Sequence, residues 1–538
     1  MEKKTLGVMI DCSRNAVMNV KSIKRFIDLL SAFGYNMLQL YTEDTYEIAE
    51  EPYFGYMRGR YTADEIKEID RYAGLKGIEL VPCIQTLAHL NAITRWAEYH
   101  PIIDCNDILL ADDERTYLLI DRMFNALSKN FTSRRVNIGM DEAHMVGLGK
   151  YLERNGYKNR FDILLKHLKK VCEIATKYGF KPMMWSDMFF RLLNNGEYYA
   201  TNKDFNKEII DAVPKEVELI YWDYYSDSEK HYDNMIKAHK KFNNNIWFAG
   251  GLWSWTGYAP HNKYSIRNTK AAIKACNKNG VENIFFTMWG DNGGECSYFS
   301  LLPALCYAAE IARGNSDLNS IKAKFKQVTG CEFDKFIMVD LPNVIGKSKQ
   351  PNINNPSKYM LYNDLFLGLY DSTVAPGDKD KYKTYARRLR NFDKTSPYYY
   401  IFDALSALCD LLYTKYDLGL NTRQAYQSGN IERLKEIVKE YTKLSKKIKI
   451  FYDKYKALWF NENKPFGFEV IEIRIGGLLL RTQSCRERLE AFIEKRIDRI
   501  EELEQKLLNV YGNNEDFEPK REVISYNLYQ NTATVNII

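Results

Sequence analysis

Two adjacent carboxylates, Asp141 and Glu142, follow a short run in which apolar residues alternate with Asn137 and Gly139. Alternation of this kind is typical of a β-strand, and a glycine-containing loop, 145–149, comes soon after the acids. Because successive strand residues point to opposite faces of a sheet, both acids can line one pocket only where the chain leaves regular β geometry. We therefore expect the pair at the carboxyl end of a strand, where an α/β barrel carries its active site.

Carboxyl groups held this close do not easily ionise together. We expect the pKa of one to rise, which leaves a proton donor, while the other stays charged. A conventional retaining glycosidase needs two carboxyl groups about 5 Å apart on opposite sides of the sugar, and sequence neighbours, with Cα atoms about 3.8 Å apart, are poorly placed for this. The pair is better suited to protonating a glycosidic oxygen while orienting a nucleophile that belongs to the substrate, such as a 2-acetamido group.

Short apolar runs alternate with amphipathic helical stretches over the first 310 residues, which is the pattern of parallel βα units. Eight candidate strands predict an α/β fold, a (β/α)8 TIM barrel, at residues 6–10, 37–41, 79–84, 136–140, 181–185, 218–222, 246–249 and 283–288. Helical spacing of apolar residues predicts helices between them, at residues 20–33, 63–75, 115–127, 161–178 and 266–279. We expect the barrel domain to comprise residues 1–314.

Five of the eight tryptophans close or follow these predicted strands, together with several acids. A single tryptophan is more often part of a core. Several at one end of a barrel, however, can form apolar walls against the C–H faces of a pyranose, while neighbouring acids bind its hydroxyl groups. We therefore expect a sugar pocket whose walls include Trp185, Trp222, Trp253, Trp255 and Trp289.

Residues 137–142 resemble the Asp-Glu signature of glycoside hydrolase family 20, the β-N-acetylhexosaminidases: His or Asn, any residue, Gly, any residue, Asp, Glu. Residues 143–149 resemble the compact bacterial branch of that family, and the resemblance spans residues 5–310. It implies an exo-acting, retaining β-N-acetylhexosaminidase that releases terminal β-linked GlcNAc or GalNAc from oligosaccharides. The acetamido group of the substrate closes to an oxazolinium intermediate in this substrate-assisted mechanism.

The resemblance implies roles for the catalytic residues. Glu142 matches the general acid, and Asp141 matches the carboxylate that orients the acetamido group and stabilises its developing charge. A tyrosine should donate to the acetamido oxygen. Tyr225 is our choice because it lies in a segment that resembles the family's Asp-x-Tyr, and Tyr224 and Tyr258 remain alternatives.

Further substrate contacts are implied in the same way. Residues 289–291 resemble the family's Trp-x-Glu after the eighth strand, so Trp289 should form the pocket floor and Asp291 should bind a hydroxyl near O4 or O6. The shorter aspartate leaves the particular hydroxyl open. His89 resembles the histidine that supports the acid pair, and a structural histidine bonded to a backbone carbonyl is the alternative.

The first predicted strand departs from the family pattern. Family members commonly carry Arg-Gly there, and that arginine binds O3 and O4 of the sugar. Leu6 replaces the arginine in this chain, although Asp11 and Arg14 remain. Other residues must therefore bind the terminal sugar, and the candidates are Arg14, Glu43 and Asp291.

Composition excludes several other functions. The net charge of +6 is small for 538 residues, and Lys and Glu are mixed along the helices, so we expect no nucleic-acid partner. There is no Walker or dinucleotide-binding motif, and His144 has no second histidine at metal-ligand spacing. We therefore expect no cofactor and no bound metal.

The location of the enzyme follows from three observations. The ten cysteines are scattered without a paired framework or a CxxC motif, and no apolar stretch reaches the length of a membrane span. The first five residues run directly into an apolar strand without the long apolar region of a secretion signal. We expect a cytoplasmic enzyme with no membrane partner.

Residues 315–538 differ from the first part of the chain in composition, because they form long segments rich in Lys, Glu, Leu and Tyr. This pattern predicts an all-helical C-terminal domain. Helical periodicity extends over residues 399–416, 431–458 and 468–508. The Pro- and Asn-rich stretch 343–356 predicts an irregular connection, and residues 523–538 can form a strand or strap. A solvated charged face is the commoner meaning of such helices, and pairing of two chains into a homodimer is the alternative.

Two other functions remain open at this point. A sugar-binding barrel without turnover would keep the indoles but would not need the acid pair. A conventional two-carboxylate β-glycosidase would show no dependence on an N-acetyl group. The preference between GlcNAc and GalNAc, the linkage and the aglycone are not determined by these residues.

Overall fold

The computed structural model describes residues 4–199, 207–345, 351–510, 512 and 528–537. The chain forms two compact units. The barrel unit comprises residues 1–252, 265–288 and 304–324, and the helical unit comprises residues 253–264, 289–303 and 325–538. The segments that follow the seventh and eighth predicted strands thus group with the C-terminal residues, and the domain boundary at residue 314 stays a prediction.

Eight parallel strands close the barrel in the order β1-β10-β9-β8-β7-β6-β3-β2, which confirms the predicted (β/α)8 fold. Each residue of β1 and β10 is buried, as expected of parallel strands covered on both faces. The bounds are β1 (Thr5–Asp11), β2 (Met37–Tyr41), β3 (Glu79–Cys83), β6 (Arg135–Asn137), β7 (Lys181–Trp185), β8 (Glu218–Trp222), β9 (Ile246–Gly251) and β10 (Asn283–Met288).

Several of the helices that follow these strands begin at side chains that cap their first turns. Asn19 accepts a backbone N–H at the start of α1 (Val20–Phe33), and Thr62 and Glu65 form a capping box at α2 (Ala63–Leu75). The other helices in this part of the chain are α3 (Glu114–Asn130), α4 (Lys150–Asn155), α5 (Arg160–Lys177), α6 (Asp187–Leu193), α7 (Lys207–Ala212), α8 (Glu229–Lys240), α9 (Asn262–Lys278) and α10 (Leu302–Ala312).

The connection between β3 and α3 contains a small antiparallel pair that the sequence analysis did not predict, β4 (Ile103–Cys105) and β5 (Ile108–Leu109). Asp104 in this pair accepts the backbone N–H groups of Gly147, at 2.7 Å, and Tyr151, at 2.8 Å. A Cβ at Gly149 would overlap the carbonyl oxygen of Asp104. The pair therefore holds the loop that follows the two acids.

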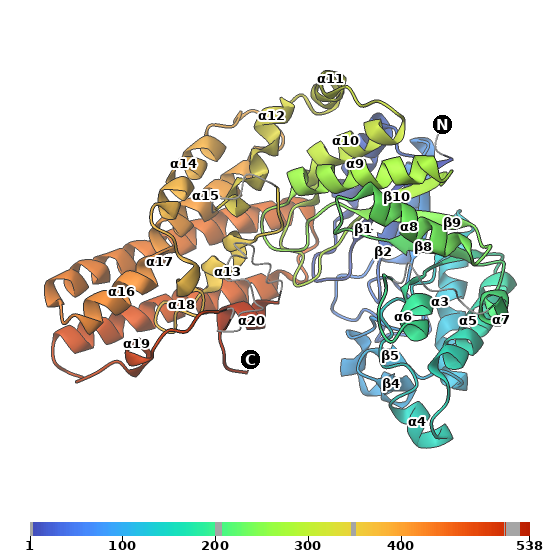
Figure 1. Ribbon diagram of the computed structural model, residues 1–538, viewed down its shortest axis with the longest axis horizontal. Coiled ribbons are helices and arrows are strands. Elements are labelled where there is room, and N and C mark those ends of the chain that lie inside the picture. The colour runs from blue at the N-terminus through green and yellow to red at the C-terminus, as the bar shows by residue number, and fades with distance from the viewer. Residues whose placement is uncertain (1–3, 200–206, 346–350, 511, 513–527, 538) are drawn as a thin grey trace. The chain divides into compact units, whose positions relative to one another are not determined.

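The helical unit is built mainly from long helices, of which α14, α15, α17 and α18 pack in succession (Figure 1). Stacked and edge-on rings of Phe336, Phe392 and Phe402 form part of its core. The helices from residue 318 onward are α11 (Leu318–Thr329), α12 (Phe333–Phe336), α13 (Pro356–Tyr362), α14 (Asp378–Arg390), α15 (Tyr399–Lys415), α16 (Leu418–Gln427), α17 (Ile431–Glu462), α18 (Phe468–Ile493), α19 (Glu501–Glu504) and α20 (Tyr529–Ala533). Within the described residues, no helix is both long enough and apolar enough to cross a membrane.

Two predictions for the C-terminal region are corrected. The helix predicted over 468–508 ends at Ile493, because Lys495 adopts a positive φ of 59° that an α-helix does not accommodate. Of the strand or strap predicted over 523–538, residues 528–537 are described and contain the short helix α20 instead, while residues 523–527 and 538 lie outside the described residues.

Candidate active site

The chain leaves β geometry where the two acids lie. Strand β6 ends at Asn137, and positive φ angles follow at Gly139 (74°), Met140 (71°) and Glu142 (51°). A Cβ at Gly139 would overlap Oε1 of Gln85 and would lie 2.7 Å from the carbonyl oxygen of Ile84, so only glycine fits. Left-handed geometry at non-glycine residues costs of order 1–3 kcal/mol each and is concentrated at functional sites.

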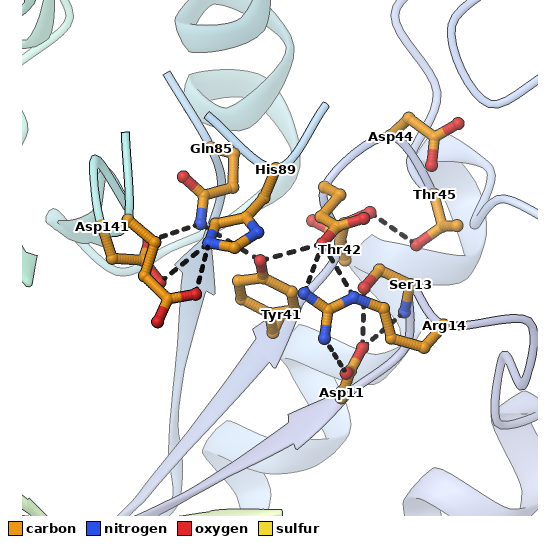
Figure 2. Close-up of polar contacts among 12 residues, drawn as sticks. Asp11, Ser13, Arg14, Tyr41, Thr42, Asp44, Thr45, Gln85, His89 and Asp141 are labelled. Carbon is orange, nitrogen blue, oxygen red and sulfur yellow. Dashed lines mark hydrogen bonds and ion pairs between the residues drawn. The ribbon is translucent and has the colours of Figure 1, made fainter. Parts of the chain in front are cut away.

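Asp141 is held as a charged group. The Nε2 atom of Gln85 donates to its Oδ1 atom at 2.7 Å, and Nε2 of His89 lies 3.3 Å from Oδ2 and 3.7 Å from Oε2 of Glu142 (Figure 2). Burial alone would raise the pKa of Asp141, but the positive charge of His89 and the bond from Gln85 lower it. Burial opposes charge on His89 too, and Asp141 nevertheless raises the pKa of His89 to about 9.

A second cluster connects to this pair through two side chains that the sequence analysis did not single out. Gln85 also donates to the hydroxyl of Tyr41 at 3.1 Å, and Tyr41 donates to Oε1 of Glu43 at 2.9 Å. Arg14 donates to the same oxygen of Glu43 at 3.0 Å and pairs with Asp11 at 3.3 Å (Figure 2). Two predicted contacts, Arg14 and Glu43, are therefore linked to Asp141 by buried polar bonds.

Glu43 combines backbone and electrostatic strain. Its φ is 42°, and burial raises the pKa of its carboxyl group although Arg14 opposes this effect. The sequence signal for Tyr41 and Gln85 was their position, because Tyr41 ends β2 and Gln85 follows β3 by two residues. Polar atoms at the carboxyl ends of barrel strands are candidates for a site even when neighbouring residues are apolar.

Two further residues adjoin Glu142 from α6. Oδ2 of Asp187 accepts the backbone N–H of Glu142 at 3.2 Å, and Arg191 donates to the same oxygen at 3.1 Å. Burial and the nearby charge of Asp141 raise the pKa of Asp187 to about 7. The carboxyl group that resists ionisation beside Asp141 is thus Asp187, which the sequence analysis did not single out.

Within the barrel unit, the predicted aromatic residues differ in exposure. Trp185 is buried against Phe285. Trp222 stacks on Tyr224 with ring centroids 5.3 Å apart, and the tilted ring of Tyr198 lies 4.9 Å from it. Tyr225 lies beyond the end of β8 and is 49% exposed.

Asp223 shapes the backbone at Tyr225. It accepts the N–H of Tyr225 at 3.1 Å, the hydroxyl of Tyr221 at 2.9 Å and a contact from His231 at 2.6 Å. Tyr225 therefore has a fixed backbone and an accessible ring.

The other predicted residues, Trp253, Trp289 and Asp291, belong to the helical unit. Trp253 is buried and stacks on Trp255 at 4.3 Å, and Ser254 donates to the carbonyl oxygen of Trp289 at 2.7 Å. Their roles toward a substrate stay predictions. Tyr258, one of the alternative tyrosines, is buried in the same unit with its hydroxyl 2.6 Å from that of Tyr362.

The loop that carries Trp289 and Asp291 is tied to helices of its own unit. Arg474 donates to the carbonyl oxygen and to Oδ1 of Asn292, both at 2.9 Å, and to Glu295 at 2.8 Å. Lys358 pairs with the other oxygen of Glu295 at 2.8 Å. In the described ranges, no group of three or more His, Cys, Asp or Glu side chains is arranged to hold a metal ion.

Comparison with known proteins places both parts of the chain. Residues 6–247 match the model of the glycosyl hydrolase family 20 catalytic domain, and residues 334–522 match that of the glycoside hydrolase 20C C-terminal domain. Hexosaminidase D of Homo sapiens is 24% identical over 346 residues, which cover 59% of this chain and 67% of that protein. Hexosaminidase D of Bos taurus is 24% identical over 264 residues, covering 46% and 69%.

A solved structure adds a more distant similarity. The family 20 exo β-N-acetylglucosaminidase of Vibrio harveyi, in complex with N-acetylglucosamine, is 16% identical with a TM-score of 0.47. The similar region covers 63% of this chain and 58% of that one.

The His89–Asp141 ion pair predicts a stability effect that depends on pH. Because the pKa of His89 is raised from 6.5 to about 9, its stabilising contribution is complete below about pH 6.5 and is lost as the pH rises through about 9. His89→Gln should therefore lower the melting temperature by a few degrees at pH 6 and by less at pH 9.5. Thermal unfolding followed by fluorescence across this range measures the difference.

The matched control is His100→Gln, which changes an exposed histidine of the same unit. Its melting temperature should follow that of the wild type across the range. If His89→Gln lowers the melting temperature by the same amount at every pH from 6 to 9.5, the ion pair does not exist in the proposed form.

The close approach at Gly139 predicts a steric penalty. Gly139→Ala combines a φ of 74° with overlap at Gln85, whereas Gly280→Ala has a φ of 65° and open space within 4 Å. Gly280→Ala should cost about 1 kcal/mol of unfolding free energy, and Gly139→Ala should cost about 2 kcal/mol more. Urea unfolding of both variants measures this, and equal costs would show that the overlap relaxes freely.

Proposed function

Because this chain belongs to glycoside hydrolase family 20, we propose that it is an exo-acting, retaining β-N-acetylhexosaminidase that removes terminal β-linked GlcNAc or GalNAc from oligosaccharides. The observation that carries the proposal is the contrast between the two acids. Asp141 is 11% exposed with a lowered pKa, and Glu142 beside it is 42% exposed. The buried Asp141 is suited to carrying a fixed negative charge, and the more exposed Glu142 is suited to exchanging a proton.

In the first step, Glu142 protonates the glycosidic oxygen while the acetamido carbonyl oxygen of the substrate attacks C1. The bond from C1 to the leaving group breaks, and an oxazolinium ion forms with inversion. The Asp141 carboxylate accepts the acetamido N–H, orients the group and stabilises its positive charge. Tyr225 donates to the acetamido oxygen.

In the second step, Glu142 is a carboxylate and acts as the general base. It takes a proton from water as the water oxygen attacks C1, which opens the oxazolinium ring with a second inversion. The product is the free sugar with its original anomeric configuration, and Glu142 is protonated again. No protein nucleophile is required, which agrees with acids that are neighbours in sequence.

We propose that Arg14 and Glu43 bind hydroxyl groups of the terminal sugar in place of the arginine that Leu6 replaces. Arg14 has an exposed fraction of 21%, and Glu43 and Asp11 fix its guanidinium. A guanidinium held by two carboxylates presents its remaining N–H groups in a defined direction. Trp185, Trp222, Trp253, Trp289 and Asp291 complete the proposed set of substrate contacts, and His89 keeps Asp141 charged.

We also propose that the enzyme acts in the cytoplasm. All ten cysteines are free thiols, and nine of them are buried. Free cysteines in this number are typical of a reducing compartment. The homodimer suggested by the helical segments stays a prediction.

The proposed mechanism predicts which substrates are cleaved. The wild type should hydrolyse p-nitrophenyl β-GlcNAc, β-GalNAc or both, and should leave the β-glucoside intact because that sugar has no acetamido group. Asp141→Asn and Glu142→Gln should each lower kcat by a factor of about 10²–10⁴. Initial rates and circular dichroism of each variant test this.

The control is Asp70→Asn, which neutralises a buried carboxylate that accepts the N–H of Thr132 at 3.2 Å. It should keep the wild-type rate. Cleavage of the glucoside would favour a conventional two-carboxylate glycosidase, and binding without cleavage of any of the three would favour a sugar-binding barrel.

The source of the nucleophile can be tested on the substrate itself. Replacing the acetamido by a trifluoroacetamido group withdraws electrons from the carbonyl oxygen, so kcat/KM should fall steeply if that oxygen attacks C1. A thiazoline analogue of the oxazolinium ion should bind more tightly than GlcNAc. Rates that do not respond to fluorination would contradict substrate assistance.

A further inference from the structure

Asp187, in α6, has a buried carboxyl group that contacts the peptide of the proposed acid. Its Oδ2 atom accepts the N–H of Glu142 at 3.2 Å and Nε–H of Arg191 at 3.1 Å. Its Oδ1 atom is buried and has no hydrogen-bond partner among the residues that the structure describes. Glu142 has a φ of 51°, a backbone conformation that residues other than glycine rarely adopt. The hydrogen bond from its N–H to Asp187 helps to hold this conformation.

Arg191 faces two carboxyl groups at once. It pairs with Asp187, and its Nη2 atom lies 4.0 Å from Oε1 of Glu142. The guanidinium also lies over the ring of Tyr198 at 5.5 Å and donates to the carbonyl oxygen of Gly196 at 3.3 Å. These contacts keep the cation near Glu142, at a longer distance than its contact with Asp187.

We propose that Asp187 and Arg191 are positioning residues that set the protonation and direction of Glu142, an inference that rests on the proposed role of Glu142 as the acid and base. Asp187 fixes the peptide of Glu142 and draws Arg191 toward itself. Arg191 then lies close enough to stabilise the carboxylate that forms after proton transfer. Because Arg191 is held by Asp187, its Nη2 atom stays 4.0 Å from Oε1 of Glu142.

Other charged and titratable groups lie near Glu142 and Asp187 in three segments of the chain. His89 lies 3.7 Å from Glu142, Asp141 is its neighbour, and His144 follows in the same loop. Tyr198 faces Asp187 and Arg191 from beyond α6. Burial and Asp141 raise the pKa of Asp187 to about 7, so the charge that holds Arg191 is present above about pH 7 and is lost as the pH falls.

Two substitutions should move the alkaline limb of the pH profile of kcat/KM in opposite directions. Asp187→Asn removes a negative charge and releases Arg191 toward Glu142, so Glu142 should lose its proton at a lower pH, by about half to one unit. Arg191→Met removes the cation and keeps an apolar side chain over Tyr198. The alkaline limb should therefore move to higher pH by a similar amount. The double variant should lie between them.

The position of the limb does not depend on how much enzyme is folded, so partial unfolding cannot imitate the result. Asp187→Asn retains an oxygen that can accept the N–H of Glu142, whereas Asp187→Ala does not. The alanine variant should therefore have the lower kcat. The matched control is Arg122→Met, because Arg122 also pairs with a buried carboxylate, Glu51, at 2.7 Å and is also partly exposed, at 30% against 19% for Arg191. Its limb should coincide with that of the wild type.

A second readout needs no turnover. In protein labelled with ¹³C at glutamate carboxyl groups, the resonance missing from Glu142→Gln identifies Glu142, and its titration should shift in the same opposite directions. Opposite shifts without hydrolysis of any acetamido sugar would support the positioning role and defeat the proposed activity. Hydrolysis with an unmoved titration, or shifts of both variants in one direction, would overturn the positioning role and leave the activity standing.

Discussion

The charge on Asp141 depends on the cation beside it, and the proposed chemistry depends on that charge. Burial of a carboxylate favours its neutral form, and protonated His89 together with the amide of Gln85 reverses this preference. Gln85 is itself fixed, because its oxygen accepts the N–H of Met140 at 3.1 Å and its nitrogen also contacts Tyr41. The same network continues to Glu43, so the proposed catalytic charge and the proposed sugar-binding residues belong to one hydrogen-bonded network.

The backbone around the acids is maintained by polar side chains instead of by sheet bonding. Met140 and Glu142 have left-handed conformations just beyond β6, where no strand neighbour stabilises them. Their N–H groups are accepted by Gln85 and Asp187, and Asp104 holds the following loop. Such conformations persist only where the surroundings impose them. The side chains that position the acids are therefore also those that stabilise an otherwise unfavourable chain path.

Sequence patterns predicted most of the barrel because parallel strands are continuous apolar runs. The bounds of β2, β7, β8 and β10 agree with prediction, whereas β6, predicted over 136–140, ends at Asn137 because alternation does not reveal a left-handed residue. The pair β4 and β5 was too short to predict. Of the site, sequence identified the residues that resemble a motif. It did not identify Gln85 or Asp187, whose importance lies in what they contact after folding.

The two acids differ in exposure in the way that their proposed roles require. A group that keeps one charge throughout a reaction is most effective when it is buried among fixed dipoles, since little reorganisation is then needed as charge develops opposite it. Asp141 meets this condition with His89 and Gln85 as partners. A group that gives a proton to a leaving oxygen and recovers one from water needs access to both. The half-exposed Glu142 has that access. Its backbone N–H is hydrogen-bonded to Asp187, so the side chain can exchange protons while the backbone stays in place.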